Sequence, residues 1–141
     1  HPNYVGYLGM HGNYGPNVNT NECDVLIAIG MRFDDRVTGN VSKYARQAKV
    51  IHIDIDKAEI NKIIRPTVAV HADAREALLE LIKLCNESSF PEWIASFKKL
   101  NNEEFEKVVA KEIRNTSSLK MAEVIYMMSQ LTKGEAVVVT D

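Results

Sequence analysis

The chain has 141 residues, of which 45% are hydrophobic and 26% charged, so it has the length and apolar content of an ordinary soluble domain. Its formal net charge of −2 gives no electrostatic reason to expect nucleic acid or an anionic membrane as a partner. No apolar run approaches the roughly 20 residues that a membrane span needs, and no signal peptide is visible, so we expect a cytoplasmic protein, in the cytosol or in the stroma of an organelle.

The cysteines and the chain ends add two expectations. Cys23 and Cys85 form no CxxC pair, which favours reduced structural thiols over a disulfide or a metal site. The sequence opens on His1 without a methionine and closes on VVVTD, the pattern of a strand that should lead into a further loop and helix. We therefore expect the chain to be a piece of a longer protein.

Residues 1–19 are dominated by Gly, Asn and Pro, and their glycines recur every third residue from Gly6 to Gly15. Glycine in a helix or strand costs about 0.5–1 kcal/mol relative to alanine, so we expect a loop here rather than a regular element. Such a loop can bring its backbone close to a ligand, with N–H groups turned outward to bind an anion. The spacing alone favours the simpler alternative of a surface loop, because it is not GxGxxG between a strand and a helix.

Apolar segments in the rest of the chain predict four β-strands, at 25–29, 50–55, 67–70 and 136–140. The first of them, VLIAI, lacks polar alternation, which predicts a strand buried on both faces. Helical patterns separate the strands. This alternation predicts an α/β fold, a parallel sheet with flanking helices and right-handed crossovers.

Helices are predicted between these strands, and the best-marked one starts after Asp73. Asp73 followed by Glu76 is typical of a capping box, and Pro91 suits the first turn of a later helix. The apolar residues of the helix after Asp73 recur at helical spacing and should face the sheet. The full set of predicted helices is 41–48, 57–64, 74–86, 92–114 and 119–131, with a short helical turn at 20–24.

Charged side chains follow the strand 25–29 at its carboxyl end. Arg32 and Arg36 flank Asp34 and Asp35, which suits recognition of phosphates and hydroxyls by guanidinium groups held in place by carboxylates. A metal site is disfavoured, because adjacent loop residues seldom direct both carboxylates at one ion and no His or Cys cluster accompanies them. The alternative is a surface salt-bridge loop of little energetic value. The position after a buried strand favours ligand binding.

The next strand also ends in carboxylates, Asp54 and Asp56. An acid at the carboxyl end of a strand is well placed to bind ribose hydroxyls, whereas an acid just ahead of a helix serves as its N-cap. We assign ligand contact to Asp54 and capping to Asp56. His52 is expected to be a satisfied core residue, and His11, in the glycine-rich loop, is the only histidine for which we expect a role in a site.

No serine or cysteine lies in a nucleophile context such as GxSxG. The residues alone therefore predict a nucleotide-binding α/β module without a catalytic set of its own. Four ordered blocks stand out in the sequence, namely GYLGMHG at 6–12, IAIGMRFDDRVTG at 27–39, IHIDIDKAEI at 51–60 and HADAREAL at 71–78. Together they give the chain a specific resemblance to acetolactate synthase (acetohydroxyacid synthase) large, catalytic subunits.

The resemblance implies a three-domain, thiamine-diphosphate-dependent enzyme. Its central domain is Rossmann-like and binds FAD, and the outer domains bind thiamine diphosphate, the last of them through Mg²⁺. Residues 1–114 would be the latter part of the central domain, and residues 115–141 the linker and first helix and strand of the carboxyl-terminal domain. The implied reaction decarboxylates pyruvate and adds the product to pyruvate or 2-ketobutyrate, in branched-chain amino acid biosynthesis. The implied partners are 2-keto acid substrates, further copies of the subunit and a small regulatory subunit.

By motif position, the resemblance also implies which residues contact FAD. Leu8, Gly9, Met10 and His11 would line the flavin. The ribityl–diphosphate portion or the adjoining channel would contact Gly30, Met31, Arg32, Asp34, Arg36 and Val37. The adenosine end would be served by Asp54, Ile55 and Glu59, with Asp73 and Ala74 beside it.

No catalytic or metal-ligating residue is implied within this chain. We therefore expect the isolated chain to have no synthase activity and to bind FAD weakly or not at all. The segment NYGPN at 13–17 departs from the alanine-rich version common in the family. The competing interpretation is a nucleotide-binding module for FAD, NAD or ADP with a regulatory or electron-transfer role, since fold alone does not fix function.

Overall fold

The computed structural model describes residues 1–113 and 118–139. These residues fall into two units, one formed by residues 1–99 and one by the described residues from 100 onward.

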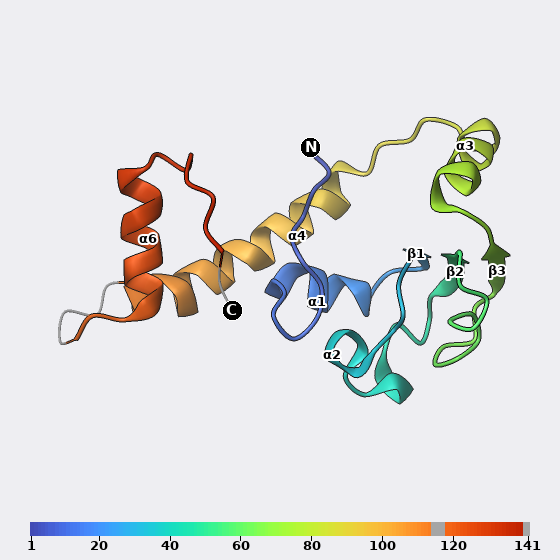
Figure 1. Ribbon diagram of the computed structural model, residues 1–141, viewed down its shortest axis with the longest axis horizontal. Helices are drawn as coiled ribbons and strands as arrows, with labels where there is room; N and C mark the ends of the chain where they lie inside the picture. The colour runs from blue at the N-terminus through green and yellow to red at the C-terminus, as the bar shows by residue number, and fades with distance from the viewer. Residues whose placement is uncertain (114–117, 140–141) are drawn as a thin grey trace. The chain divides into compact units, whose positions relative to one another are not determined.

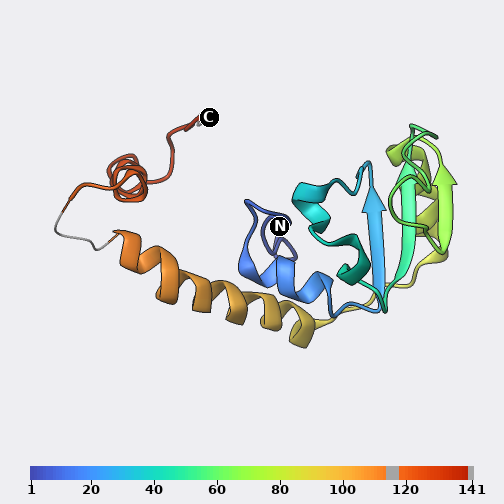
Figure 2. The same cartoon turned by 90° about the horizontal axis from the view of Figure 1, so that it is seen from below.

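The first unit is built on a parallel sheet of three strands, β1 (Val25–Ile29), β2 (Lys49–Asp54) and β3 (Val68–His71). The strands lie in the order β1-β2-β3, with Val25 opposite Lys49 and Ile51 opposite Val68. Figure 2 shows the three arrows side by side and pointing the same way. The predicted α/β fold with a parallel sheet is confirmed.

Helices flank the sheet, and Figure 1 shows α3 and α2 on opposite sides of it. The helix α3 (Ala74–Leu84) follows β3 and contacts β2. Its N-cap is Asp73, as predicted, since the Asp73 carboxylate accepts the N–H groups of Arg75 and Glu76. The other elements of this unit are α1 (Tyr14–Thr20), α2 (Asp35–Thr38), the 3₁₀ turn η1 (Val41–Lys43) and the first part of α4 (Pro91–Glu104).

The main core of this unit lies between β1, β2 and the segment that follows β1. Ala28 and Val50 supply the sheet side, and Phe33, Tyr44 and Ala45 cover them. The Phe33 ring is 2% exposed and packs edge-on against Tyr44, with 6.3 Å between ring centroids. Phe33 adopts a positive φ of 54°, which is uncommon for a non-glycine residue, so the packing of its ring outweighs the backbone cost.

The prediction that β1 is buried on both faces is wrong. Val25, Ile27 and Ile29 are 40–47% exposed, whereas Ala28 between them is buried. On this face, Ile53 of the neighbouring strand β2 is 3% exposed, so the face is covered over β2 but only partly over β1. The apolar stripe of α3 behaves similarly, because only Ala77 and Leu81 of it are half-buried while the rest is exposed. A sequence pattern identifies an apolar face but does not say whether a neighbour covers it.

The loop predicted over residues 1–19 is only partly correct, because α1 occupies its second half. Asn13 is at the N-cap position of this helix, and Pro16 lies in the first turn, where a missing N–H costs no helical hydrogen bond. Gly15 and Pro16 are buried, so packing offsets the poor helix propensity of glycine. The helical turn predicted at 20–24 is not formed, because Thr20 is the last residue of α1 and residues 21–24 are a turn and a bend that lead into β1.

The two short helices predicted at 41–48 and 57–64 are also wrong. The first reduces to η1, whose N-cap is Asn40, and a positive φ of 42° at Ala45 prevents the helix from continuing. The second is a series of turns, in which Asp56 accepts the N–H of Ala58 at 2.9 Å and Asn61 takes a φ of 63°. Segments of fewer than about 12–15 residues form stable helices only when tertiary packing supports them.

The second unit is helical. After α4 ends, the π-helical turn η2 (Phe105–Val109) leads into α5 (Ala110–Ile113), and α6 (Met121–Leu131) follows. The predicted helix 92–114 is confirmed to residue 113, and residue 114 lies outside the described residues. The strand predicted at 136–140 is not formed at 136–139, because no described segment pairs with it, and residue 140 lies outside the described part.

Tyr44 makes the stability of the first unit depend on pH in the alkaline range. Burial, with a smaller contribution from Cys23, raises the pKa of Tyr44 from 10.0 to about 12. Because the folded state holds the proton more tightly, this stabilisation is present below pH 10 and is lost as the pH rises through 12. We expect the urea midpoint of the wild type to fall between pH 10 and 12 more steeply than that of Tyr44→Phe. Parallel midpoints for the two proteins across this range would contradict the assignment.

Candidate functional site

The carboxyl ends of the three strands meet at one edge of the sheet, because the strands are parallel. The Gly30 N–H donates to the carbonyl of Ile53 at 2.9 Å, which joins the exit of β1 to the end of β2. The Ala72 N–H donates to the carbonyl of Asp54 at 3.1 Å, which joins the exit of β3 to the same place. This edge is where ligands bind in open parallel sheets.

Asp54 closes β2 at the centre of this edge. It is 7% exposed, and its Oδ1 accepts the N–H of Asp56 at 2.8 Å. A carboxylate offers about four lone-pair sites, so Asp54 keeps acceptor capacity for a ligand. Asp56 is exposed and caps the turn that follows. The division of roles between the two aspartates is consistent with this geometry.

Glu59 lies in the turn after β2 and carries an unusual oxygen. Its Oε1 accepts from the Lys62 ammonium at 2.7 Å. Its Oε2 is buried and has no hydrogen-bond partner among the described residues. A buried acceptor without a donor is costly, so it marks a place where a donor from a ligand would be stabilising. Ile55, between Asp54 and this turn, is largely exposed.

The charged segment after β1 is ordered by Asp34. Its Oδ1 accepts the N–H of Val37 at 3.2 Å and so caps α2, while its Oδ2 lies 3.4 Å from Nη2 of Arg32. The arginine is thereby held by a carboxylate, as predicted, but the pair is solvent-exposed and contributes little stability. Met31 packs against the core, and Asp35 and Arg36 are exposed.

The glycine-rich loop is closed by two asparagines rather than by its glycines. The Asn13 carboxamide accepts the N–H of Tyr7 at 3.0 Å. The Asn17 carboxamide accepts the N–H of Gly9 and donates to the carbonyl of Gly9, both at 2.9 Å. Through these hydrogen bonds, Asn13 and Asn17 of the NYGPN segment fix the path of the loop backbone.

The sequence also allows this loop to turn its N–H groups outward as an anion-binding nest. That possibility is wrong for the five N–H groups that donate hydrogen bonds within the protein. The N–H groups of Tyr7, Gly9, Met10, Gly12 and Asn13 all donate to acceptors within the protein. A backbone donor that is already satisfied internally offers little to an anion. His11 at the tip of the loop is exposed.

The loop meets the helix α2, and a hollow lies at the junction. The Met10 N–H donates to the carbonyl of Arg36 at 2.6 Å. A hollow of about 290 Å³ lies beside this contact. Five of the predicted site residues line it, namely Leu8, Gly9, Met10, Arg36 and Val37.

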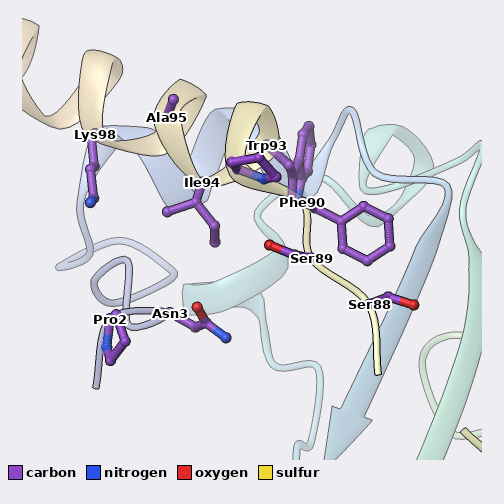
Figure 3. Close-up of a pocket in the computed structure, with 10 residues that line it drawn as sticks. Pro2, Asn3, Ser88, Ser89, Phe90, Trp93, Ile94, Ala95 and Lys98 are labelled. Carbon is purple, nitrogen blue, oxygen red and sulfur yellow. The ribbon is translucent and has the colours of Figure 1, made fainter. Parts of the chain in front are cut away.

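A larger hollow of about 420 Å³ lies elsewhere in the first unit, between the amino-terminal residues and the start of α4. Figure 3 shows Phe90 and Trp93 on one side of it and Pro2 and Asn3 near the other. None of the predicted site residues lines this hollow. Size alone therefore does not identify the site.

The structure thus groups the predicted residues into two sets. One set surrounds the loop–α2 junction, and the other lies at the carboxyl edge of the sheet with Gly30, Asp54 and Glu59. Asp73 is engaged in capping α3, and Ala74 is exposed at the start of that helix.

Sequence reasoning missed one residue beside Asp54. His52 is a core residue, as predicted, but it is not satisfied, because neither ring nitrogen has a hydrogen-bond partner in the described residues. The His-x-Asp spacing was the available signal, since residues two apart on a strand share a face.

Comparison with known proteins adds the family. Residues 1–81 match the family model described as thiamine pyrophosphate enzyme, central domain. An acetolactate synthase isozyme 3 large subunit of Escherichia coli is 34% identical over the whole chain, which covers 25% of that protein. The acetolactate synthase large subunit of Lactococcus lactis is 36% identical, again over the whole chain and 24% of the relative.

A probable acetolactate synthase large subunit of Methanocaldococcus jannaschii is 44% identical over 72% of the chain and 18% of its own length. The chain therefore spans about a quarter of the length of the first two relatives and less of the third. The family model covers more than half of the chain, from the glycine-rich loop into α3. The chain belongs to the thiamine pyrophosphate enzyme family, in which residues 1–81 correspond to the central domain.

Proposed function

We propose that this chain is part of an acetolactate synthase large subunit and supplies one side of an FAD site in its central domain. The complete subunit would use thiamine diphosphate and Mg²⁺ bound outside this chain. It would decarboxylate pyruvate and join the resulting two-carbon unit to pyruvate or 2-ketobutyrate. The identity to synthase large subunits along the whole chain supports this proposal. The same relatives give no support to a regulatory or electron-transfer module.

The buried Oε2 of Glu59 is the observation that carries the cofactor assignment. It is an acceptor without a donor, in the turn that follows the carboxylate of Asp54 at the strand edge. The hydroxyl groups of an adenosine ribose are donors, so these two carboxylates fit that part of FAD chemically. A nucleotide without free hydroxyls would leave Glu59 unsatisfied.

The other predicted residues fit the remaining parts of the cofactor by charge and shape. Arg32, held by Asp34, and Arg36 at the rim of the loop–α2 hollow suit the diphosphate. Leu8, Gly9, Met10 and His11 would line the flavin. FAD in this role supplies a rigid scaffold for the active site, and its redox chemistry takes no part in the proposed reaction.

The remaining features of the complete protein follow from the same proposal. Residues 115–141 would begin the carboxyl-terminal thiamine-diphosphate domain, and the subunit would assemble with further copies and with a small regulatory subunit in the cytoplasm. In the part of the chain that the structure describes, no helix has the length and apolarity needed to cross a bilayer.

A segment exchange tests the proposal. The chain replaces the matching segment of the E. coli isozyme 3 large subunit, to which it is 34% identical over its whole length. We expect the chimera to retain FAD through gel filtration and to form acetolactate from pyruvate, whereas the isolated 141-residue chain forms none. In the chimera, Asp54→Asn should weaken FAD binding about tenfold, because a charge-assisted hydrogen bond contributes roughly 1.5–3 kcal/mol.

The matched control is Asp56→Asn, since Asp56 caps a turn with its side chain and meets Asp54 only through its backbone N–H. We expect this variant to bind FAD within about threefold of the unsubstituted chimera, less than one hydrogen bond is worth. A folded chimera without FAD, or equal losses from the two aspartate variants, would refute the assignment. Acetolactate formed by the isolated chain would refute the assignment of catalysis to other domains.

A further inference from the structure

The central strand β2 holds a histidine in a slot built from small and aromatic neighbours. His52 is 0% exposed. Its register partners are Ala28 on β1 and Ala69 on β3, whose small side chains leave room for the imidazole between them. The Phe33 ring covers it edge-on, with 5.1 Å between ring centroids.

The described residues of the slot offer the two ring nitrogens of His52 no hydrogen-bond partner at normal distance. Within residues 1–113 and 118–139, neither Nδ1 nor Nε2 has a hydrogen-bond partner. Nε2 lies 3.7 Å from Oδ2 of Asp54, which is slightly beyond hydrogen-bond length. An apolar side chain would fill the slot without the desolvation cost of two polar nitrogens, so packing does not account for a histidine here.

We propose that His52 is a positioning residue that holds the Asp54 carboxylate for a ligand bearing a vicinal diol. The inference rests on the proposed function, because it deepens the adenosine contact assigned to Asp54. His52 touches no ligand and acts only through Asp54.

The hydrogen-bond directions support this role. The N–H of Asp56 fixes Oδ1 of Asp54 from the loop side. A neutral His52 that carries its proton on Nε2 donates toward Oδ2 from within the sheet, after a shift of less than 1 Å from the 3.7 Å separation. Each oxygen is then held by one protein donor and keeps a lone pair for one hydroxyl of the diol.

The arrangement also limits the carboxylate to one orientation. A carboxylate held at one oxygen can rotate about its Cβ–Cγ bond, whereas one held at both oxygens cannot. Preorganisation of this kind lowers the entropy that the ligand must remove on binding. Removal of the His52 donor should therefore weaken diol binding without removing any contact to the ligand.

The first test needs no cofactor. In the ¹⁵N-histidine-labelled chain, long-range ¹H–¹⁵N spectra report the tautomer of His52. We expect the proton on Nε2, with its resonance displaced in Asp54→Asn and unchanged in Asp56→Asn. A proton on Nδ1, or no response to Asp54→Asn in a chain with dispersed amide signals, overturns the proposal.

The second test measures FAD affinity in the chimera. His52→Met removes the donor at similar volume, and His52→Gln keeps an N–H near the position of Nε2. We expect His52→Met to weaken FAD binding about tenfold, His52→Gln to recover most of it, and His52→Met to cause no further loss beside Asp54→Asn.

The two tests separate the possible failures. If His52→Met and Asp54→Asn weaken FAD binding independently, or if His52→Gln is as weak as His52→Met, His52 is only a core residue and the inference fails. If the chimera binds no FAD while the tautomer and its response to Asp54→Asn are as expected, the cofactor assignment fails and the His52–Asp54 pairing stands.

Discussion

Replacement of Phe33 by alanine is expected to lower the free energy of unfolding of the first unit by about 3–5 kcal/mol, the range for a buried aromatic truncated to alanine. The ring is 2% exposed and packs edge-on against both Tyr44 and His52, so its loss opens a cavity at the centre of the core. Small domains have only about 5–15 kcal/mol of stability, and the variant should populate the unfolded state measurably. Urea titration followed by far-ultraviolet circular dichroism measures the change.

Phe90→Ala is the matched control for this experiment, because it removes the same ring from a residue that is 67% exposed in the same unit. We expect the control to change the free energy of unfolding by less than about 1 kcal/mol. If the two variants lose similar stability, Phe33 is not the centre of the core.

Replacement of Gly9 by alanine is expected to disrupt the junction between the glycine-rich loop and α2. Gly9 has a φ of 105°, and a Cβ there would lie 2.9 Å from the carbonyl oxygen of Arg36 and 3.3 Å from Cα of Val37. The backbone strain of alanine at this φ costs about 1–3 kcal/mol. The added Cβ also meets backbone atoms of Arg36 and Val37, which cannot move aside as the end of a side chain would. The crowding adds a further cost of about 1–3 kcal/mol. FAD retention in the chimera and urea unfolding of the chain measure the two consequences.

Gly39→Ala separates strain from crowding. Gly39 also has a positive φ, 56°, but a Cβ there meets no atom within 4 Å. We expect this variant to lose only the backbone cost, about 1–3 kcal/mol, and to leave the loop–α2 junction intact. Equal losses in the two glycine variants, or unchanged FAD retention in Gly9→Ala, would show that the close approach of Gly9 to Arg36 is unimportant.

The sequence predicts the elements that depend on local pattern. The apolar runs of β1 and β2, the Asp73 cap and the Pro91 start are each encoded by a few adjacent residues, and each is present. The convergence of the strand ends follows from the parallel pairing that the sequence predicts. The short helices failed because their formation depends on packing that adjacent residues do not specify.

The candidate site was likewise predictable only in part. Its motifs are visible in sequence, whereas the geometry that orders them is not. The Asn17 carboxamide reaches the backbone of Gly9 across eight positions, and composition alone identifies only an asparagine-rich loop. The unpaired oxygen of Glu59 has no sequence signal at all, and the burial of His52 depends on Ala28, Phe33 and Ala69 from three separate segments.

The left-handed backbone at Phe33 has a consequence for protein engineering. Because the Phe33 ring packs in the core while the next residue, Asp34, caps α2, one residue joins the hydrophobic interior to the charged segment. The two regions are therefore not independent modules for directed evolution. Libraries that diversify Arg32 or Asp34 should hold Phe33 constant. Substitutions that repack the core around Phe33 will also change the orientation of the Arg32 and Asp34 side chains.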